Sequence, residues 1–367
     1  MTDDTSCFLP NTVESRYPVK FKYNSVILCY VMRTTLLYSN SSDTRLTVPN
    51  SLQYPGYIPA NLQNQLFLSF NSAIILSIDV GYCDVVTQGR DYLNILFWNT
   101  YNNANKYNIN NCISELISDK SCDLIILAEY NDEISMLCQL VNKQSDEGYH
   151  PIPNYGGCAR IKGLIKEGFA LEIICEQARY QIAKIETVYF RLLIAMIHNV
   201  SKLRASDDMQ EENLRCFHND IRIEESKYNT SNTLIIGDLN VNPFEKSCVS
   251  ASTLHAIPFL QEVRRPTRIV QKREYHKFYN PTWKLYSNRE TPYTTYFYDN
   301  SDMVNYYWNA FDQVIIRPQL ADAFDDDSLE IISDTRNHKL MQNNRPDKTN
   351  YSDHLPLFFS LKEDKIK

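Results

Sequence analysis

Several apolar stretches of this sequence end in polar residues that could bind a cation or carry out acid–base chemistry. These residues are Asn99, Glu129, His198, Asp238 with Asn240, and Asp353 with His354. Each lies at the end of a predicted strand or one step into the next loop, where a rigid sheet can hold side chains from distant parts of the chain together. Taken singly, each also has a simpler interpretation, such as an Asx turn or a helix cap.

Taken together, these residues supply what hydrolysis of a phosphate ester requires. Carboxylate and amide oxygens are the ligands that a hard cation such as Mg²⁺ or Mn²⁺ prefers. A further carboxylate and a histidine can provide the acid–base groups for an in-line attack at phosphorus. The pattern therefore predicts metal-dependent phosphoester chemistry.

Alternating strands and helices must position these side chains. Short apolar runs predict buried strands, and apolar residues at helical spacing predict helices. The expected strands are 93–99, 123–129, 168–175, 187–197, 233–236, 311–316 and 355–361, and the expected helices are 108–118, 133–142 and 207–225. The order strand, helix, strand at the start of this region predicts a mixed α/β sandwich.

Six short motifs, in this order, resemble the endonuclease/exonuclease/phosphatase superfamily, which has the DNase I-like fold. The motifs are Phe97-Trp98-Asn99, Leu127-Ala128-Glu129, Ile197-His198-Asn199, Ile236-Gly237-Asp238-Leu239-Asn240, Phe311-Asp312-Gln313 and Ser352-Asp353-His354. The Gly-Asp-x-Asn and Ser-Asp-His motifs are the more specific signals. A looser likeness to uncharacterised bacterial members lies in 279–283 and 308–313.

This resemblance implies a four-layer αββα sandwich, with two mixed β-sheets face to face, helices outside and the site at one edge. It places the catalytic domain at 92–362, after an N-terminal segment, 1–91, of unknown role. For the metal, Mg²⁺ or Mn²⁺, it implies Glu129 as the main ligand. Asn99 and Asp353 would complete or support the metal shell.

The resemblance also implies catalytic roles. Asp238 would orient or deprotonate the attacking water, and Asn240 would position the phosphate. His354 would hydrogen-bond the scissile phosphate or assist proton transfer. Asp312 would orient a histidine, either His198 or His354.

One family feature has no clear counterpart in the sequence. Several family nucleases place a tyrosine or arginine that contacts the phosphate between the Glu motif and the Gly-Asp-x-Asn motif. Arg160 and Arg179 are candidates for this role, but neither has a diagnostic sequence context.

A basic stretch after the Gly-Asp-x-Asn motif bears on the substrate. Residues 264–277 contain six Lys or Arg residues against one Glu, and aromatic residues follow. Phosphate contacts combined with stacking faces are typical of nucleic-acid grooves. The predicted substrate-binding residues are Arg264, Arg265, Arg268, Lys272, Arg273 and Trp283. A solvated loop beside core aromatic residues is the alternative interpretation of this stretch.

We therefore expect a nuclease that acts on DNA or RNA. Two alternatives stay open: a phosphatase or phosphodiesterase for small phosphoesters such as inositol phosphates, and a non-catalytic binding protein that retains the fold. The intact set of catalytic motif residues favours an enzyme over the binding protein.

Composition limits the remaining possibilities. The 367 residues carry a net charge of −7, which argues against a protein that coats nucleic acid through a uniformly basic surface. The N-terminus has neither a signal peptide nor an apolar run long enough to cross a bilayer, so no membrane association is expected. Ten cysteines occur without zinc-type spacing, which favours free thiols and a cytoplasmic location. No obligate protein partner is inferable.

Overall fold

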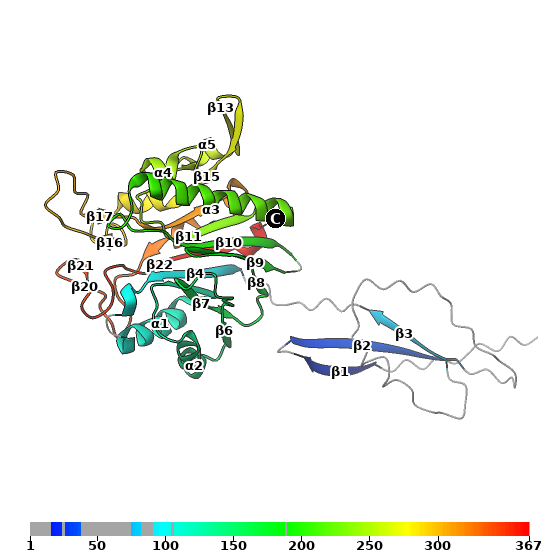
Figure 1. Cartoon of the computed structure of the whole chain (residues 1–367). Coiled ribbons are helices and arrows are strands. Elements are labelled where there is room, and N and C mark those ends of the chain that lie inside the picture. The colour runs from blue at the N-terminus through cyan, green and yellow to red at the C-terminus, as the bar shows by residue number, and fades with distance from the viewer. Residues whose placement is uncertain are drawn as a thin grey trace, which may run out of the picture. The chain divides into compact units, whose positions relative to one another are not determined.

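The chain divides into two compact units, Met1–Gln88 and Gly89–Lys367 (Figure 1). The computed structural model describes residues 16–23, 26–37, 75–81, 91–103, 106–187 and 189–366. In the first unit, strands β1 (Arg16–Tyr23), β2 (Val26–Leu37) and β3 (Ile75–Gly81) form an antiparallel sheet in the order β1-β2-β3. The predicted division at residues 91 and 92, and the role of the N-terminal segment, stay predictions.

Two large mixed sheets form the centre of the second unit. The first contains β4 (Tyr92–Asn99), β5 (Leu124–Ala128), β6 (Tyr149–Pro151), β7 (Ile161–Lys166), β19 (Glu330–Ile331) and β22 (Leu357–Lys362), in the order β19-β22-β4-β5-β7-β6. The second contains β8 (Leu171–Gln177), β9 (Tyr180–Glu186), β10 (Arg191–His198), β11 (Thr233–Asp238), β12 (Ala256–Ile257), β15 (Phe278–Tyr279) and β18 (Asp312–Ile316), in the order β12-β15-β18-β11-β10-β9-β8.

The two sheets pack face to face through alternate side chains of their strands. Ile95 and Phe97 of β4 belong to the same buried cluster as Ile194 and Met196 of β10. Successive side chains of a strand point to opposite faces, so the residues between them must be covered from outside. Because both faces are buried, the central strands are continuous apolar runs, which is why the sequence predicts them well.

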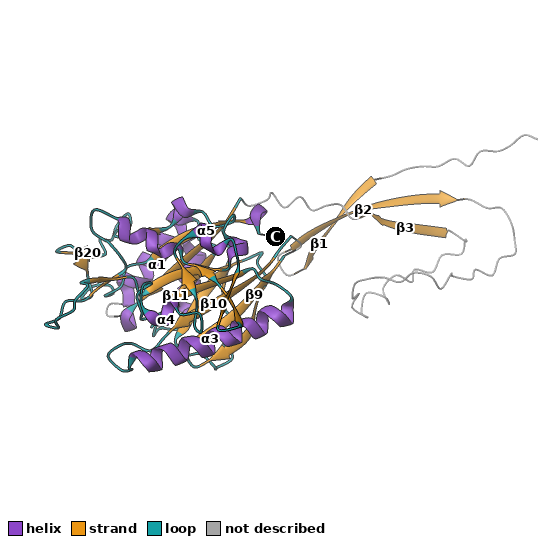
Figure 2. Ribbon diagram, turned by 90° about the horizontal axis from the view of Figure 1, so that it is seen from above, coloured by secondary structure: helices purple, strands orange, loops and turns teal. Residues whose placement is uncertain are grey.

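Helices cover the outer faces of both sheets (Figures 1 and 2). Helices α1 (Lys106–Lys120) and α2 (Ile134–Gln144) pack on the first sheet, where Trp98 of β4 lies in their cluster. Helix α3 (Asp207–Tyr228) packs on the second sheet. The Ser206 side chain caps its start by accepting a hydrogen bond from the backbone N–H of Met209. The predicted αββα sandwich is confirmed.

Shorter elements connect these layers. They are α4 (Lys246–Val249), α5 (Leu260–Val263), the hairpins β13 (Thr267–Val270) with β14 (Arg273–His276), β16 (Tyr296–Phe297) with β17 (Trp308–Asn309) and β20 (Met341–Gln342) with β21 (Arg345–Pro346), and the 3₁₀ helices η1 (Tyr101–Asn103), η2 (Pro281–Ser287), η3 (Pro318–Leu320), η4 (Asp326–Ser328) and η5 (Glu363–Lys365). Among the helices of the described residues, none is both long and apolar enough to cross a membrane.

Candidate active site

Strand direction brings the predicted site residues to one edge of the sandwich. Strands β4 and β5 are parallel, and so are β10 and β11, so the residues that end them meet at the same edge. Strand β18 is antiparallel to β11, which places Asp312 directly opposite Asp238. Strand β22 is antiparallel to β4, so the loop before it carries Asp353 and His354 to this edge as well.

Backbone conformation at this edge explains part of the Gly-Asp-x-Asn motif. Gly237 has φ 149°, and a Cβ atom at this position would lie 1.9 Å from the carbonyl oxygen of Ile197. Glycine is therefore required where β11 passes β10. The backbone N–H of Asn240 then donates to Asp238 Oδ1 at 2.8 Å, and Asn240 adopts φ 53°. This Asx turn fixes the Asp238 carboxylate as the strand ends.

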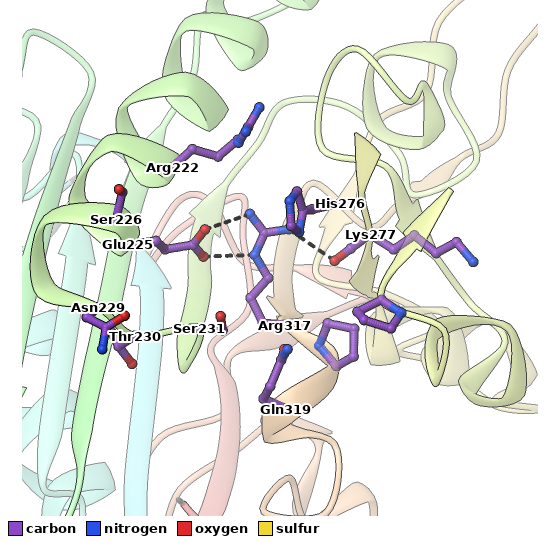
Figure 3. Close-up of a pocket in the computed structure, with 12 residues that line it drawn as sticks. Arg222, Glu225, Ser226, Asn229, Thr230, Ser231, His276, Lys277, Arg317 and Gln319 are labelled. Carbon is purple, nitrogen blue, oxygen red and sulfur yellow. Dashed lines mark hydrogen bonds and ion pairs between the residues drawn. The ribbon is translucent and has the colours of Figure 1, made fainter. Parts of the chain in front are cut away.

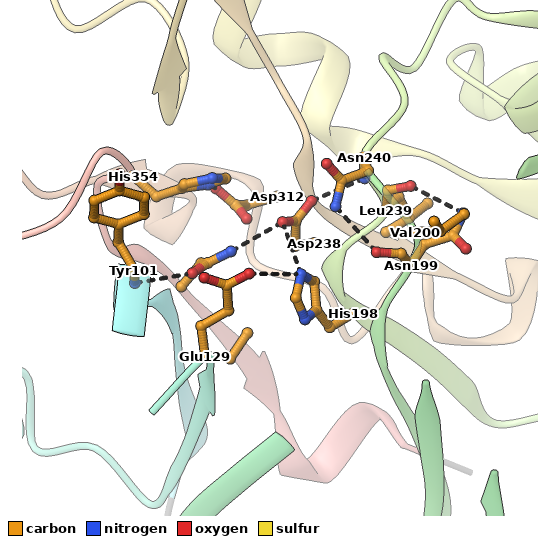
Figure 4. A network of polar contacts seen from close by, with 12 residues as sticks. Tyr101, Glu129, His198, Asn199, Val200, Asp238, Leu239, Asn240, Asp312 and His354 are labelled. Carbon is orange, nitrogen blue, oxygen red and sulfur yellow. Dashed lines mark hydrogen bonds and ion pairs between the residues drawn. The ribbon is translucent and has the colours of Figure 1, made fainter. Parts of the chain in front are cut away.

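One cavity of about 480 Å³ collects these side chains. Seven of the predicted site residues line it: Asn99, Glu129, His198, Asp238, Asn240, Asp353 and His354. Asp312 is fully buried behind His354 and completes the polar network shown in Figure 4. The structure therefore brings together all eight predicted catalytic and metal-binding residues, while the roles of the individual residues stay predictions.

Asp238 is buried with both carboxylate oxygens hydrogen-bonded. Its exposed fraction is 1%, and Asn99 Nδ2 donates to Oδ2 at 3.0 Å, on the other side from the Asn240 N–H. Burial is the main cause that raises the pKa of Asp238, His354 opposes it and Asp312 adds to it, and the resulting pKa is about 7. A carboxyl group with this pKa can accept a proton at neutral pH, as a general base must.

His354 forms a tight pair with Asp312. The distance from His354 Nδ1 to Asp312 Oδ2 is 2.7 Å. Burial alone would lower the pKa of His354, but the Asp312 carboxylate outweighs burial and raises this pKa to about 10. His354 is therefore cationic at neutral pH, with Nδ1–H donating to Asp312 and Nε2–H left to donate to a substrate oxygen. Of the two histidines that Asp312 was predicted to orient, the structure selects His354.

His198 plays a different electrostatic part. Its Nε2 lies 3.4 Å from Glu129 Oε1 and 3.7 Å from Asp238 Oδ2. Burial, with Arg160 and other cations nearby, lowers the pKa of His198 to about 3. The ring is therefore neutral at pH 7, and its position between two carboxylates favours the tautomer with hydrogen on Nε2.

The donor set of this cavity fits a hard divalent cation. Glu129 and Asp353 both line the cavity, and burial raises the pKa of each carboxyl group. Asp353 Oδ1 is buried without a hydrogen-bond partner in the described part of the chain. A cation would relieve the desolvation of both carboxylates. The Asn99 amide oxygen accepts from the Tyr101 N–H and keeps a second lone pair.

A second group of possible ligands lies beside it. Each of its three residues offers one ligand atom, and these atoms lie within 4.8 Å of one another; the residues are Asp238, Asp312 and His354. Two members of that group, Asp312 and His354, are already hydrogen-bonded to each other. An oxygen-ligated cation such as Mg²⁺ therefore suits Glu129 and Asp353 better than this group.

Binding of Mg²⁺ should be visible as a change in stability. At 10–100 times its dissociation constant, Mg²⁺ is expected to raise the free energy of unfolding by roughly 1.4–2.7 kcal/mol. A Glu129→Gln variant should lose this gain, because a neutral amide is a poor substitute for the carboxylate. Thermal melts with Mg²⁺ and with EDTA measure the effect, and Glu172→Gln, at an exposed carboxylate in β8, is the control. An unchanged Mg²⁺ gain in Glu129→Gln would remove Glu129 from the metal site.

Three arginines line the same cavity. They are Arg160, Arg179 and Arg204. Burial and the other two guanidinium groups lower the pKa of Arg179, as expected for cations close together. Arg160 and Arg179 were candidates from the sequence, whereas Arg204 was missed because it lies in a loop without any periodic pattern. The three guanidinium groups give the cavity a cationic side suited to phosphate.

The basic stretch lies elsewhere. It forms the β13–β14 hairpin, and none of the six predicted substrate-binding residues lines the catalytic cavity. The hairpin leads into β15 beside Arg317, whose N–H donates to the Thr233 carbonyl at the start of β11. Asp238 ends β11, so this contact of Arg317 lies at the other end of the strand, about 16 Å from Asp238. Trp283 is half-buried in η2, with Phe244 and Tyr286 as ring neighbours.

A separate cavity of about 320 Å³ lies at the base of this hairpin, between it and the end of α3 (Figure 3). Arg317 lines this cavity, but its guanidinium group already has hydrogen-bond partners within the protein. Its Nε and Nη2 donate to the two carboxylate oxygens of Glu225 at 2.8 and 3.0 Å, and Nη1 donates to the Lys277 carbonyl. The guanidinium also stacks on Phe278, 3.7 Å from the ring centre. This cavity is therefore built around a structural ion pair.

No family model and no curated protein matches the sequence. Solved structures are similar over about three quarters of the chain. D. rerio TDP2, in complex with a single-strand DNA product, is 17% identical with TM-score 0.45, over 74% of this chain and 99% of that one. An endonuclease/exonuclease/phosphatase family protein from Bacteroides thetaiotaomicron is 11% identical with TM-score 0.45, over 74% and 97% of the two chains.

The catalytic domain of human Nocturnin, with a bound sulfate anion, is 14% identical with TM-score 0.45, over 74% of this chain and 95% of that one. At these identities the likeness concerns the fold.

Proposed function

We propose that this chain is a divalent-metal-dependent phosphodiester hydrolase that acts on nucleic acid. The observation that carries the proposal is the composition of the single catalytic cavity. It combines a buried carboxyl group of pKa about 7, a histidine of pKa about 10, two carboxylates suited to a cation and three arginines. Each of these groups answers a separate need of hydrolysis at phosphorus.

The proposed division of labour follows the charges of these groups. Asp238 accepts a proton from the water that attacks phosphorus. His354 donates Nε2–H to a phosphoryl oxygen, whose negative charge increases as the water bonds to phosphorus. The P–O bond to the leaving group then breaks, and the leaving oxygen keeps the electron pair of that bond. Asn240 helps to position the phosphate. Mg²⁺ or Mn²⁺, held by Glu129 and Asp353 with Asn99 in support, would act as a Lewis acid on the phosphate.

The basic hairpin keeps a narrower place in this proposal. The basic residues Arg264, Arg265, Arg268, Lys272 and Arg273 do not line the catalytic cavity. They can contact only nucleic acid that extends well beyond the scissile phosphate. Such contacts would be electrostatic and independent of base sequence. A cytoplasmic location also stays a proposal.

Hydrolysis of a panel of substrates tests this proposal and separates it from two other functions. Small phosphoesters such as inositol phosphates would suit the three arginines, and a binding protein could retain the cavity without turnover. The panel contains single- and double-stranded DNA, RNA, bis-p-nitrophenyl phosphate and inositol phosphates, each with Mg²⁺, Mn²⁺ or EDTA. We expect metal-dependent cleavage of nucleic acid that EDTA abolishes.

Other outcomes of the panel have definite meanings. Activity confined to inositol phosphates would replace the nuclease by a phosphatase. Turnover that persists in EDTA would contradict the metal requirement. A folded protein without turnover on any substrate would favour the binding protein.

A further inference from the structure

A second cavity opens directly beside the catalytic one. It measures about 350 Å³ and shares four lining residues with the catalytic cavity: Ser201, Leu203, Asn240 and Tyr296. The two cavities therefore adjoin at these residues. We call the second space the aromatic groove, and its other walls come from the segment between β16 and β17 and from Phe311, which precedes β18.

Aromatic rings form one wall of this groove, and the first of them lies beside His354. The Tyr296 ring lies 4.6 Å from His354, 5.2 Å from Phe311 at 26°, and 6.3 Å from Tyr298 at 11°, measured between ring centres. Tyr298 and Tyr306 also line the groove and are 41% and 57% exposed. Large aromatic faces left open to solvent beside a catalytic centre are suited to stack a flat ligand group.

The groove lacks the arginines that make one side of the catalytic cavity cationic. Glu245 and Asp302 line it, and Lys202 is the one cation among its lining residues. Lys202 is already paired with Glu245 and lies 3.8 Å from Asp207. Phosphate is therefore favoured on the arginine side of the site and disfavoured in the groove. A neutral, planar group is the ligand that this combination of charge and aromatic surface accepts.

The segment that carries the exposed tyrosines is held by its own hydrogen bonds. The Asn305 side chain donates to Asp299 Oδ1 and to the Asn300 carbonyl, and its Oδ1 accepts from the Tyr307 N–H at 2.8 Å. These amide groups are occupied in holding the loop, so they offer little hydrogen-bonding capacity to a ligand. Recognition in the groove must then rest on stacking, which discriminates weakly between bases.

We propose that the aromatic groove receives an unpaired nucleobase next to the scissile phosphate, so that the chain acts on single-stranded nucleic acid with little base preference. This inference rests on the proposed function and specifies its substrate class. A base within a duplex is stacked and paired, and moving it out of the duplex costs a few kcal/mol. A single strand can place a base on Tyr298 and Tyr306 without that cost, with the next phosphates on the arginine side.

The test compares binding of three ligands by a Tyr298→Ala/Tyr306→Ala double variant. The ligands are a labelled single-stranded 12-mer, the same strand made entirely abasic, and the 12-mer as a duplex. Fluorescence anisotropy is read with Mg²⁺, in an Asp238→Asn background that prevents turnover. We expect about 5- to 150-fold weaker binding of the base-bearing single strand. Binding of the abasic strand should not change.

Two controls make the result specific. Tyr298→Phe/Tyr306→Phe keeps the rings and should retain the affinity of the parent protein. Tyr189→Ala removes a tyrosine that is 72% exposed and lies outside both cavities, and should have no effect. Equal weakening of the base-bearing and abasic strands, or unchanged binding of both, would overturn the stacking role. Equal affinity of the parent for duplex and single strand would overturn the strand preference.

Failure of the proposed function gives a different signature. In that case the unmodified chain, without the Asp238 change, hydrolyses no phosphodiester with any metal. The binding comparison does not depend on turnover, so it still decides whether the groove stacks a base. Normal hydrolysis together with equal weakening of both strands would instead overturn only the groove.

Discussion

An Asp238→Asn variant is expected to hydrolyse phosphodiesters with a turnover number about 10²–10⁴-fold lower than that of the unmodified chain. Asparagine has nearly the same shape but cannot take a proton from water. The Asn99 amide and the Asn240 N–H both donate to Asp238, so the site is built for an acceptor on each side. The measurement is the initial rate with bis-p-nitrophenyl phosphate and saturating Mg²⁺.

Stability must be measured alongside this rate. Substitution by asparagine turns one acceptor into a donor that faces Asn99, yet it also removes a buried charge. These two effects oppose each other, so we expect the variant to fold. Asp327→Asn, at a fully exposed carboxylate in η4, is the matched control and should retain the full rate. A folded Asp238→Asn protein with a turnover number within about threefold of the parent would exclude Asp238 as the base.

The sequence predicts the catalytic strands well for a physical reason. Strands β4, β5, β10 and β11 are buried on both faces, so they consist mainly of apolar residues and end at a polar residue or just before one. The same reason explains two strands that were missed. Strand β7 contains Lys162 and Lys166, and β9 contains Lys184, and these residues interrupt the apolar pattern. Lys166 is buried and its Nζ lies 3.6 Å from Asp123, a pairing that no local pattern indicates.

Two sequence-based expectations, the histidine partner of Asp312 and the position of the basic stretch, depended on strand direction. Asp312 could orient either histidine until its register opposite Asp238 placed it against His354. The basic stretch follows the Gly-Asp-x-Asn motif closely in sequence, which suggested a place beside the active site. The basic stretch, however, leads to Arg317, which contacts the start of β11, whereas Asp238 lies at the end of this strand. Residues close to Asp238 in sequence are therefore not close to it in space. The aromatic groove was missed because its tyrosines lie in a loop without periodic spacing.

An Asp312→Asn variant is expected to lose about 10²–10³-fold in turnover, because a donor aimed at the developing charge is typically worth that much. Asparagine cannot balance a positive charge on His354, so the pKa of His354 falls from about 10 and its ring becomes neutral at lower pH. The alkaline limb of the pH–rate profile should move to lower pH. Rates measured from pH 6 to 10 with Mg²⁺ present test both effects.

The same pair should make stability depend on pH in a defined direction. The folded-state pKa of His354 lies above its ordinary value of 6.5, so the folded state binds the proton more tightly than the unfolded state. The stabilisation from the Asp312–His354 pair is then complete below pH 6.5 and is lost as the pH rises through about 10. Urea unfolding of the parent and of Asp312→Asn, in EDTA, should give a difference that shrinks across this range.

This difference separates an ionic pair from a neutral hydrogen bond. A neutral His354 would still donate from Nδ1 to Asp312, but its contribution would not vary between pH 6.5 and 10. A constant difference in the free energy of unfolding, together with an unmoved alkaline limb, would therefore mean that His354 is not the cation of the site. The charge of the phosphate would then be stabilised by Arg160, Arg179 and Arg204. The His354→Gln change would then reduce turnover by little more than the effect of one lost hydrogen bond.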